Sequence, residues 1–359
     1  MRIFLISNMY PSPSNPDYGV FVRNFKEKME DKGVAFTNIS VIKGRSSGKA
    51  KKLFAYIRHY LSVLKNYRKN DYDLIYVHFI SHNAPILALL LLLFSKKTPI
   101  VVNVHGSDVI IHNKGILRIF NSLLLKQTDL VVVPSSYFKD IVKSKFQFYK
   151  KANVFVNPSG GIDLTTFYPE KPAMNKYRRY NIGYVSRIDE GKGWNHFLEA
   201  LSILKNEGVK FKAKMIGKGN QIESLKLRIK ELSLDNEVVY KGALKQEELR
   251  KVYNSLDIFI FPSTLVESLG LVGLEAMACG VPVIASDMAG PKTYVIDGEN
   301  GFLTYPGDIS KIAECLKEYE NYSKDKKEMM KEFSVNTAKK YDSQRTANNL
   351  YNELKKLME

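Results

Sequence analysis

Two carboxylates, Glu267 and Glu275, lie on either side of the expected start of a helix near Gly270, after an apolar strand that ends at Phe261. A helix start offers unpaired backbone N–H groups and the positive end of the helix dipole, which together bind anions. A phosphate held there would have a carboxylate on each side, and carboxylates accept hydrogen bonds from hydroxyl groups. The spacing therefore favours a nucleotide-sugar site, although Glu267 could simply cap the helix and Glu275 face solvent.

A pair of cations, Arg187 and Lys192, occupies a loop that also contains Gly191 and Gly193. This loop follows the first expected strand of the second half of the chain. A planar guanidinium and a compact ammonium at this spacing can both reach one diphosphate. A solvated surface loop would carry the same residues, so the pattern alone does not decide between the two interpretations.

The first half of the chain supplies fewer candidates. His105 ends an expected strand, and ligands of parallel α/β sheets bind at the carboxyl ends of strands. A lone histidine there can equally be structural, and Asp108 is a further candidate for contact with an acceptor. Gly19 precedes an amphipathic helix, and Gly217 follows a strand in a Gly-Lys-Gly segment that lacks the third glycine of a dinucleotide fingerprint.

Composition limits the class of protein. The 359 residues are 45% hydrophobic and 25% charged, which fits two globular domains and excludes a disordered or fibrous chain. Two cysteines, Cys279 and Cys315, make no disulfide framework. The net charge is +17, and residues 1–168 carry 24 basic and 10 acidic side chains. A field of this sign attracts nucleic acid, an anionic membrane or anionic substrates, but no nucleic-acid recognition motif is present.

The segment Lys43–Lys69 contains nine Lys or Arg side chains and no acid. Such a basic amphipathic helix is typical of binding to an anionic membrane surface, although a packed helix with a solvated basic side also fits. The longest apolar run, Ala84–Phe94, is shorter than the roughly 20 residues of a membrane span and predicts a buried helix. The expected apolar face of the basic segment carries Leu53, Tyr56, Ile57, Tyr60, Leu61 and Leu64.

Short apolar strands alternate with longer amphipathic stretches in both halves, which predicts parallel sheets covered by helices and hence an α/β fold of two Rossmann-like domains. We expect an N-terminal domain over residues 1–168, a second domain over 169–342 and a terminal helix over 343–359. Prolines at 169 and 172 mark the linker. The expected strands are Ile3–Ser7, Asn38–Ile42, Leu74–His78, Ile100–His105, Leu130–Pro134, Asn153–Val156, Asn181–Val185, Lys212–Ile216, Val238–Lys241, Ile258–Phe261 and Val283–Ala285.

The segment over residues 262–284 closely resembles family four of the retaining glycosyltransferases, whose E-x7-E signature matches Glu267 and Glu275. The resemblance covers most of the chain and is strongest over residues 181–305. It implies the GT-B fold, in which two Rossmann-like domains face each other across a deep cleft. It also implies that residues 169–342 bind the nucleotide-sugar donor, that residues 1–168 bind the acceptor, and that the terminal helix crosses back to the N-terminal domain.

The resemblance also implies roles for single residues. It places Glu267 on the donor sugar and Glu275 on the ribose hydroxyls, and it makes Arg187 and Lys192 the clamp on the donor diphosphate. It places His105 near the donor sugar. The family often has a Gly-Gly pair near the phosphates, of which this chain keeps only the second glycine. The cofactor-binding set is Gly19, Gly217, Ser268, Leu269, Gly270, Leu271 and Glu275.

These features together predict a retaining hexosyl- or N-acetylhexosaminyltransferase. Its donor would be a nucleoside diphosphate sugar, with UDP favoured over GDP, and its acceptor a hydroxyl of a lipid-linked saccharide in cell-surface polysaccharide assembly. No cofactor or metal is expected, because the one Asp-x-Asp triplet, Asp71–Asp73, precedes a strand. We expect a cytoplasmic enzyme bound peripherally to the inner face of the membrane, without nucleic acid. The alternatives are a nucleotide-sugar 2-epimerase of the same fold and a non-enzymatic protein that binds membranes or nucleic acid.

Overall fold

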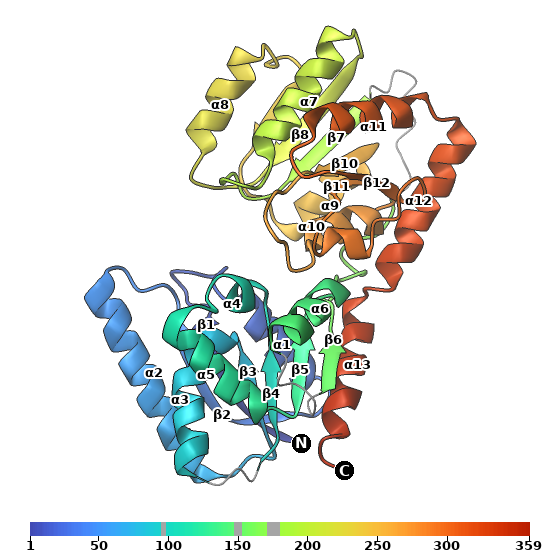
Figure 1. The fold of residues 1–359 in the computed structure, drawn as a ribbon. Helices are drawn as coiled ribbons and strands as arrows, with labels where there is room; N and C mark the ends of the chain where they lie inside the picture. Colours follow the sequence, from blue (N-terminus) through green and yellow to red (C-terminus); the bar gives the residue numbers. More distant parts are fainter. Residues whose placement is uncertain (95–97, 147–152, 171–179) are drawn as a thin grey trace. The chain divides into compact units, whose positions relative to one another are not determined.

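The computed structural model describes residues 1–94, 98–146, 153–170 and 180–359 (Figure 1). The chain forms two compact units. Unit 1 comprises Met1–Gly160 and Gln344–Glu359, and unit 2 comprises Gly161–Ser343. The division therefore comes slightly before the boundary predicted after residue 168. Part of the predicted linker, Lys171 and Pro172, lies outside the described residues.

Unit 1 contains a six-stranded parallel sheet in the order β2-β1-β3-β4-β5-β6. Helices cover this sheet, and the last helix of the chain, α13, runs alongside β6 (Figure 1). The strands are β1 (Arg2–Tyr10), β2 (Ala35–Lys43), β3 (Leu74–His78), β4 (Ile100–Asn103), β5 (Leu130–Val133) and β6 (Asn153–Val156). The helices are α1 (Val20–Glu30), α2 (Lys49–Lys69), α3 (Ile80–Leu93), α4 (Ser107–Ile110), α5 (Gly115–Lys126), α6 (Ser136–Lys145) and α13 (Ser343–Lys355).

Unit 2 contains a second six-stranded parallel sheet, in the order β12-β11-β10-β7-β8-β9. Its strands are β7 (Tyr180–Val185), β8 (Phe211–Ile216), β9 (Val238–Lys241), β10 (Ile258–Phe261), β11 (Val283–Ser286) and β12 (Gly301–Thr304). Its helices are α7 (Trp194–Asn206), α8 (Ile222–Glu231), α9 (Gln246–Asn254), α10 (Leu271–Ala278), the 3-10 turn η1 (Pro291–Thr293), α11 (Ile309–Asn321) and α12 (Lys324–Lys339).

The strand orders decide where ligands can bind. In unit 2 the direction in which strands are added reverses between β7 and β10, which are neighbours in the sheet. In unit 1 it reverses between β1 and β3. Loops diverge at such a reversal and leave a crevice beyond the carboxyl ends of the strands. The loops after β7 and β10 carry the candidate residues of unit 2.

Every predicted strand overlaps an observed one, and both sheets are parallel as predicted. The sequence missed β12, because this four-residue strand begins with a glycine and lacks a long apolar run. The terminal helix α13 packs on unit 1. Its Ala347, Leu350 and Leu354 lie in one hydrophobic cluster with Ile3 and Leu5 of β1.

The apolar face of α2 differs from the predicted one. Tyr60 is half-buried and its hydroxyl donates to the carbonyl oxygen of His82, while Tyr56 accepts a hydrogen bond from Asn8. The exposed apolar side chains of α2 are instead Leu53, Phe54, Ile57 and Leu61.

The run over residues 84–94 is also only partly buried. Leu87 and Leu90 of α3 pack in the core, whereas Leu92 and Leu93 are exposed. Among the described helices, none combines the length and apolarity needed to cross a bilayer.

Candidate functional site

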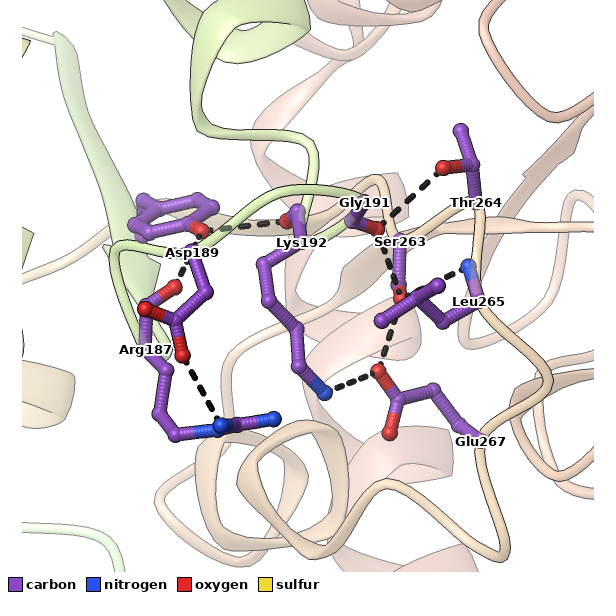
Figure 2. A network of polar contacts seen from close by, with 9 residues as sticks. Arg187, Asp189, Gly191, Lys192, Ser263, Thr264, Leu265 and Glu267 are labelled. Carbon is purple, nitrogen blue, oxygen red and sulfur yellow. Dashed lines mark hydrogen bonds and ion pairs between the residues drawn. The ribbon is translucent and has the colours of Figure 1, made fainter. Parts of the chain in front are cut away.

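An ion pair joins the two loops at the crevice of unit 2. Lys192, in the loop after β7, places its Nζ 2.6 Å from Oε1 of Glu267, in the loop after β10 (Figure 2). The Ser263 hydroxyl donates to the same carboxylate oxygen at 2.7 Å. The side chains of Lys192 and Glu267 are only 12% and 16% exposed. Oε2 of Glu267 has no partner among the residues described, so this oxygen is free to accept a hydrogen bond from a ligand hydroxyl.

Backbone contacts hold these two loops together. The carbonyl oxygen of Gly191 accepts the N–H of Thr264 at 2.8 Å and also the Thr264 hydroxyl (Figure 2). Gly193 adopts a φ of 74°, and a Cβ at that position would lie 2.0 Å from the carbonyl oxygen of Pro262. Only glycine permits this approach. The glycines of the loop therefore place Lys192 beside Glu267, a role that the sequence did not reveal.

Arg187 lies in the same loop as Lys192, but its side chain has a different partner. Its Nη1 donates to Oδ2 of Asp189 at 2.8 Å (Figure 2), and the Arg187 side chain is 64% exposed. The other oxygen of Asp189 accepts the N–H of Asn220. Because an exposed ion pair contributes little stability, the guanidinium can exchange Asp189 for a phosphate at small cost.

The start of α10 presents free donors. The N–H groups of Ser268, Leu269 and Gly270 have no hydrogen-bond acceptor among the described residues. Gly270 is the N-cap, with a φ of 80° and no side-chain cap, and its carbonyl oxygen accepts from the Tyr294 hydroxyl at 2.9 Å. Leu271, the first residue of α10, follows directly. The prediction of a helix start at this point is correct, and such a start suits an anion.

Glu275 is not the solvated residue that the simpler interpretation assumed. Its Oε2 accepts a hydrogen bond from the buried hydroxyl of Tyr253 at 3.1 Å. Burial raises the pKa of Glu275 to about 7, and the hydrogen bond from Tyr253 opposes this rise. Glu267 does not cap α10 either, since the cap residue is Gly270. Contact of Glu275 with a ribose stays a prediction.

Two of the candidate glycines have structural reasons for being glycine. A Cβ on Gly217 would lie 1.8 Å from the carbonyl oxygen of Ser186, and one on Gly19 would lie 2.6 Å from the carbonyl carbon of Met9. Both glycines have positive φ, of 145° and 72°. They let neighbouring backbone segments approach at the carboxyl ends of β8 and β1, and their contact with a ligand stays a prediction.

In unit 1, His105 forms a neutral pair with a second histidine. Its Nε2 lies 3.0 Å from Nδ1 of His78, the last residue of β3, and the two rings stack. The Phe21 ring lies 4.3 Å from that of His105. Burial lowers the pKa of His105 to about 3, and burial together with the neighbouring His105 lowers the pKa of His78. The pair is therefore uncharged at neutral pH, and it suits hydroxyl groups better than phosphates.

Asp108 holds the backbone next to this pair from inside the protein. It is fully buried, and its two oxygens accept the backbone N–H groups of His105 at 3.0 Å and Ile80 at 3.2 Å. Burial raises its pKa to about 6. The carboxylate thus ties the loop after β4 to the start of α3, and it does not reach an acceptor as the sequence had suggested.

Within the part of the chain that the structure describes, no three His, Cys, Asp or Glu side chains gather as a metal site would require. The two cysteines are free and buried, and burial raises the pKa of each thiol to about 12. Neither is a thiolate nucleophile at neutral pH.

Comparison with known families accounts for nearly all of the chain. Residues 169–339 match the model described as glycosyl transferases group 1, and residues 17–165 match glycosyltransferase family 4. The two matches meet close to the boundary between the two units.

Several curated proteins are similar in sequence. An uncharacterised 41.2 kDa protein of the cps region of Klebsiella pneumoniae is 27% identical over 79% of each chain. The capsular polysaccharide biosynthesis glycosyltransferase CapM of Staphylococcus aureus is 28% identical over 54% of this chain and 52% of its own. A GDP-mannose-dependent phosphatidylinositol monomannoside mannosyltransferase of Mycolicibacterium smegmatis is 28% identical over 60% and 59%. These last two matches span less than two thirds of the relatives' lengths.

Solved structures share the fold. Sucrose-phosphate synthase from Thermosynechococcus elongatus has a TM-score of 0.78 and 18% identity, with 99% of each chain covered. Alr3699/HepE of Anabaena in complex with UDP-glucose has a TM-score of 0.74 and 19% identity, over 99% of this chain and 100% of its own.

Proposed function

The chain belongs to family four of the glycosyltransferases and has the GT-B fold, and from this premise we propose that it transfers a sugar from a nucleoside diphosphate donor to a saccharide hydroxyl. The observation that carries the proposal is the crevice of unit 2. There the cation Lys192, the carboxylate Glu267 and the free N–H groups before α10 lie within one pair of loops. A diphosphate needs the donors, and a sugar hydroxyl needs the carboxylate.

We propose UDP as the favoured donor base and GDP as the second choice. A structural neighbour is named as a complex with UDP-glucose, while the mycobacterial relative is named for GDP-mannose. The transferred group would be a hexosyl or N-acetylhexosaminyl unit. The relative CapM is named for capsular polysaccharide biosynthesis, which supports an acceptor that is a growing surface polysaccharide. We propose that a lipid carries this acceptor.

The proposed chemistry retains the configuration of the sugar. The bond from the anomeric carbon to the diphosphate breaks, the acceptor oxygen attacks from the same face, and the leaving diphosphate takes the acceptor proton. Arg187, Lys192 and the N–H groups before α10 would stabilise the charge that develops on the diphosphate. The transition state then requires neither a metal nor a separate protein base.

Donor binding is the first test. Purified protein is screened for a rise in melting temperature with UDP-, GDP- and ADP-sugars, alongside the Lys192→Ala variant. Lys230→Ala, an exposed lysine on α8, serves as the matched control. We expect one nucleotide class to raise the melting temperature of wild type and control, but much less that of Lys192→Ala. No stabilisation by any nucleotide would contradict the proposal. The anomeric configuration of the product, read by NMR, tests retention.

We further propose that unit 1 docks on the inner face of the membrane through α2. Leu53, Phe54, Ile57 and Leu61 are 64%, 68%, 49% and 62% exposed on a helix that carries no acid in its first turn. The same helix carries the basic side chains of Lys49, Lys51, Arg58 and Lys65. Each Lys or Arg near an anionic surface contributes about 1 kcal/mol of attraction, and apolar side chains add shallow insertion.

Vesicle sedimentation tests this docking. The triple variant Lys49→Glu/Lys51→Glu/Arg58→Glu should no longer bind vesicles that contain anionic lipid. Its affinity for the nucleotide should stay as in the wild type. Binding of the wild type should weaken as salt shortens the Debye length from about 10 Å at 0.1 M to about 3 Å at 1 M. Equal sedimentation of variant and wild type would contradict this part of the proposal.

A further inference from the structure

A cavity in unit 1 lies where β1 and β2 end and α2 begins. Its volume is about 290 Å³. At roughly 30 Å³ for each water it replaces, that is room for about ten waters, or one hexose ring with a substituent. The groups that could contact a ligand are Asn8, Tyr18, Arg45, Ser46, Lys52 and Tyr56.

Two cations line this cavity without a carboxylate partner. Neither Arg45 nor Lys52 forms an ion pair with any residue that the structure describes. The Arg45 guanidinium lies 5.4 Å from the centre of the Tyr18 ring, which holds it over an aromatic face. Two unneutralised positive charges beside a cavity favour an anionic ligand.

The first turn of α2 has the same sign of charge. Lys49, Lys51 and Lys52 occupy this turn, and the N-cap Gly48 offers no side-chain acceptor. Cations at a helix N-terminus oppose the helix dipole, so this arrangement is unfavourable for the helix alone. A bound anion reverses the sign of the interaction, because it is attracted both to the lysines and to the free N–H groups.

The remaining lining suits a sugar. Asn8 is 4% exposed; its Nδ2 donates to the Tyr56 hydroxyl at 3.2 Å, and its Oδ1 has no partner among the described residues. The Tyr18 hydroxyl donates to the Asn8 carbonyl oxygen at 3.5 Å. An aromatic face, an amide oxygen without a donor and two phenolic hydroxyls match the C–H faces and hydroxyl groups of a saccharide.

Ring contacts connect the cavity with His105. The ring centre of His82 lies 5.6 Å from that of Tyr56 and 5.9 Å from that of Phe79. The Phe79 ring in turn stacks on His105, with their centres 6.4 Å apart. All these rings are at the carboxyl edge of the sheet of unit 1. A chain of packed rings therefore connects the cavity with the neutral histidine pair.

We propose that this cavity is an acceptor subsite that binds a saccharide unit carrying an anionic group, either a carboxylate or a phosphate. The inference rests on the proposed function, since it names the class of acceptor for that transferase. Arg45, Lys52 and the start of α2 bind the anion, while Tyr18, Asn8 and Tyr56 contact the ring.

Calorimetric titration of the full chain tests the proposal with four probes: glucuronic acid, glucose 1-phosphate, glucose and inorganic phosphate. Both anionic sugars should bind at least tenfold more tightly than glucose or inorganic phosphate. The stronger of the two anionic sugars identifies the anion as a carboxylate or as a phosphate, such as that of a lipid diphosphate. Equal binding of glucose, equal binding of inorganic phosphate, or no binding of either anionic sugar would each overturn the proposal.

The variant Arg45→Gln/Lys52→Gln locates the binding. Both changed side chains are exposed, so its melting temperature should stay close to that of the wild type. It should lose at least tenfold in affinity for the anionic sugars, whereas Lys65→Gln/Arg68→Gln, which also removes two positive charges but farther along α2, should lose none. Unchanged affinity in the double variant would place the sugars elsewhere.

Titration of UDP and of GDP in parallel separates this inference from the proposed function. The double variant should bind UDP and GDP as the wild type does, because the nucleotide belongs to unit 2. If the wild type binds no nucleotide, the proposed transferase fails. If it binds UDP or GDP but the variant still binds the anionic sugars normally, only the subsite fails.

Discussion

Each unit has a six-stranded parallel sheet, yet the chemistry at the carboxyl ends of the strands differs between the two. In unit 2 the edge carries full charges: the pair of Lys192 with Glu267, and Arg187, whose side chain is 64% exposed. In unit 1 the corresponding edge carries two neutral histidines, the buried His78 and the partly exposed His105. Cations and N–H groups stabilise a phosphate. A neutral imidazole, which has one N–H donor and one acceptor nitrogen, suits a hydroxyl group, which both donates and accepts hydrogen bonds. One fold therefore supplies two kinds of surface, and the loops decide which.

The strand order explains part of this difference. In unit 2 the reversal lies between β7 and β10, so two loops that are far apart in sequence meet and form the Lys192–Glu267 pair. In unit 1 the histidine pair joins the end of β3, which borders the reversal, to the loop after β4, the next strand in the sheet. Unit 2 thus pairs residues across its reversal, whereas unit 1 pairs them on one side of it.

The largest expected effect comes from Lys192→Ala, which leaves Glu267 without its cation and, on the proposed function, would remove a charged donor from the diphosphate. A charge-assisted contact contributes about 1.5–3 kcal/mol, so kcat should fall about ten- to a hundredfold. Steady-state kinetics with the donor found in the nucleotide screen measures this, with Lys230→Ala as control. Wild-type turnover in a folded Lys192→Ala protein would show that unit 2 does not use its charges in this way.

The next effect concerns the buried carboxyl of unit 2. Because the folded-state pKa of Glu275 is about 7 and its unfolded value is near 4.5, the folded state holds the proton more tightly. Glu275 therefore favours folding most below pH 4.5, and this contribution declines as pH rises through 7.

Chemical denaturation at several pH values measures this contribution. Glu275→Gln should remove a decline of about 1–3 kcal/mol in the free energy of unfolding between pH 4.5 and 7. The exposed Glu299→Gln should leave that decline unchanged. Parallel curves for wild type and Glu275→Gln would mean that the carboxyl is ionised in the folded protein.

A smaller effect is expected in unit 1. Replacing His78 by Leu deletes the partner of His105, and a lost hydrogen bond of about 1 kcal/mol predicts a fall of roughly fivefold in kcat/KM. His78→Asn, whose amide can take the place of Nδ1, should recover most of the rate. Since the pKa of His105 is about 3, neither protein should show a histidine titration in its rate between pH 5.5 and 8. Such a titration would contradict the neutral pair.

The smallest expected effect is that of a chelator, which should leave the rate unchanged. The cations and N–H groups of unit 2 would provide the charge that a metal ion supplies in other transferases. Assays with and without EDTA decide this, and loss of activity that manganese restores would refute it.

The sequence predicted the strands, the two sheets and the helix start near Gly270, because apolar periodicity and glycine placement are local signals. It did not predict that Ser263 and Lys192 converge on one oxygen of Glu267, since 75 residues separate the ion pair. It also missed the partnership of His78 with His105 and the burial of Asp108, which depend on neighbouring strands. On α2, periodicity revealed apolar residues but not which of them pack: Tyr56 and Tyr60 turn inward, while Phe54 is exposed.

The position of α13 has a consequence for how the protein is made. Its Ala347, Leu350 and Leu354 complete a hydrophobic cluster of unit 1, although they follow all of unit 2 in the chain. A ribosome that adds about 5–20 residues each second needs on the order of ten seconds or more to pass from residue 160 to these side chains. During that interval the surface under α13 is uncovered beside the nascent unit 2. The first unit to be synthesised is therefore the last to be completed, and folding of this chain does not proceed simply from its N-terminus to its C-terminus.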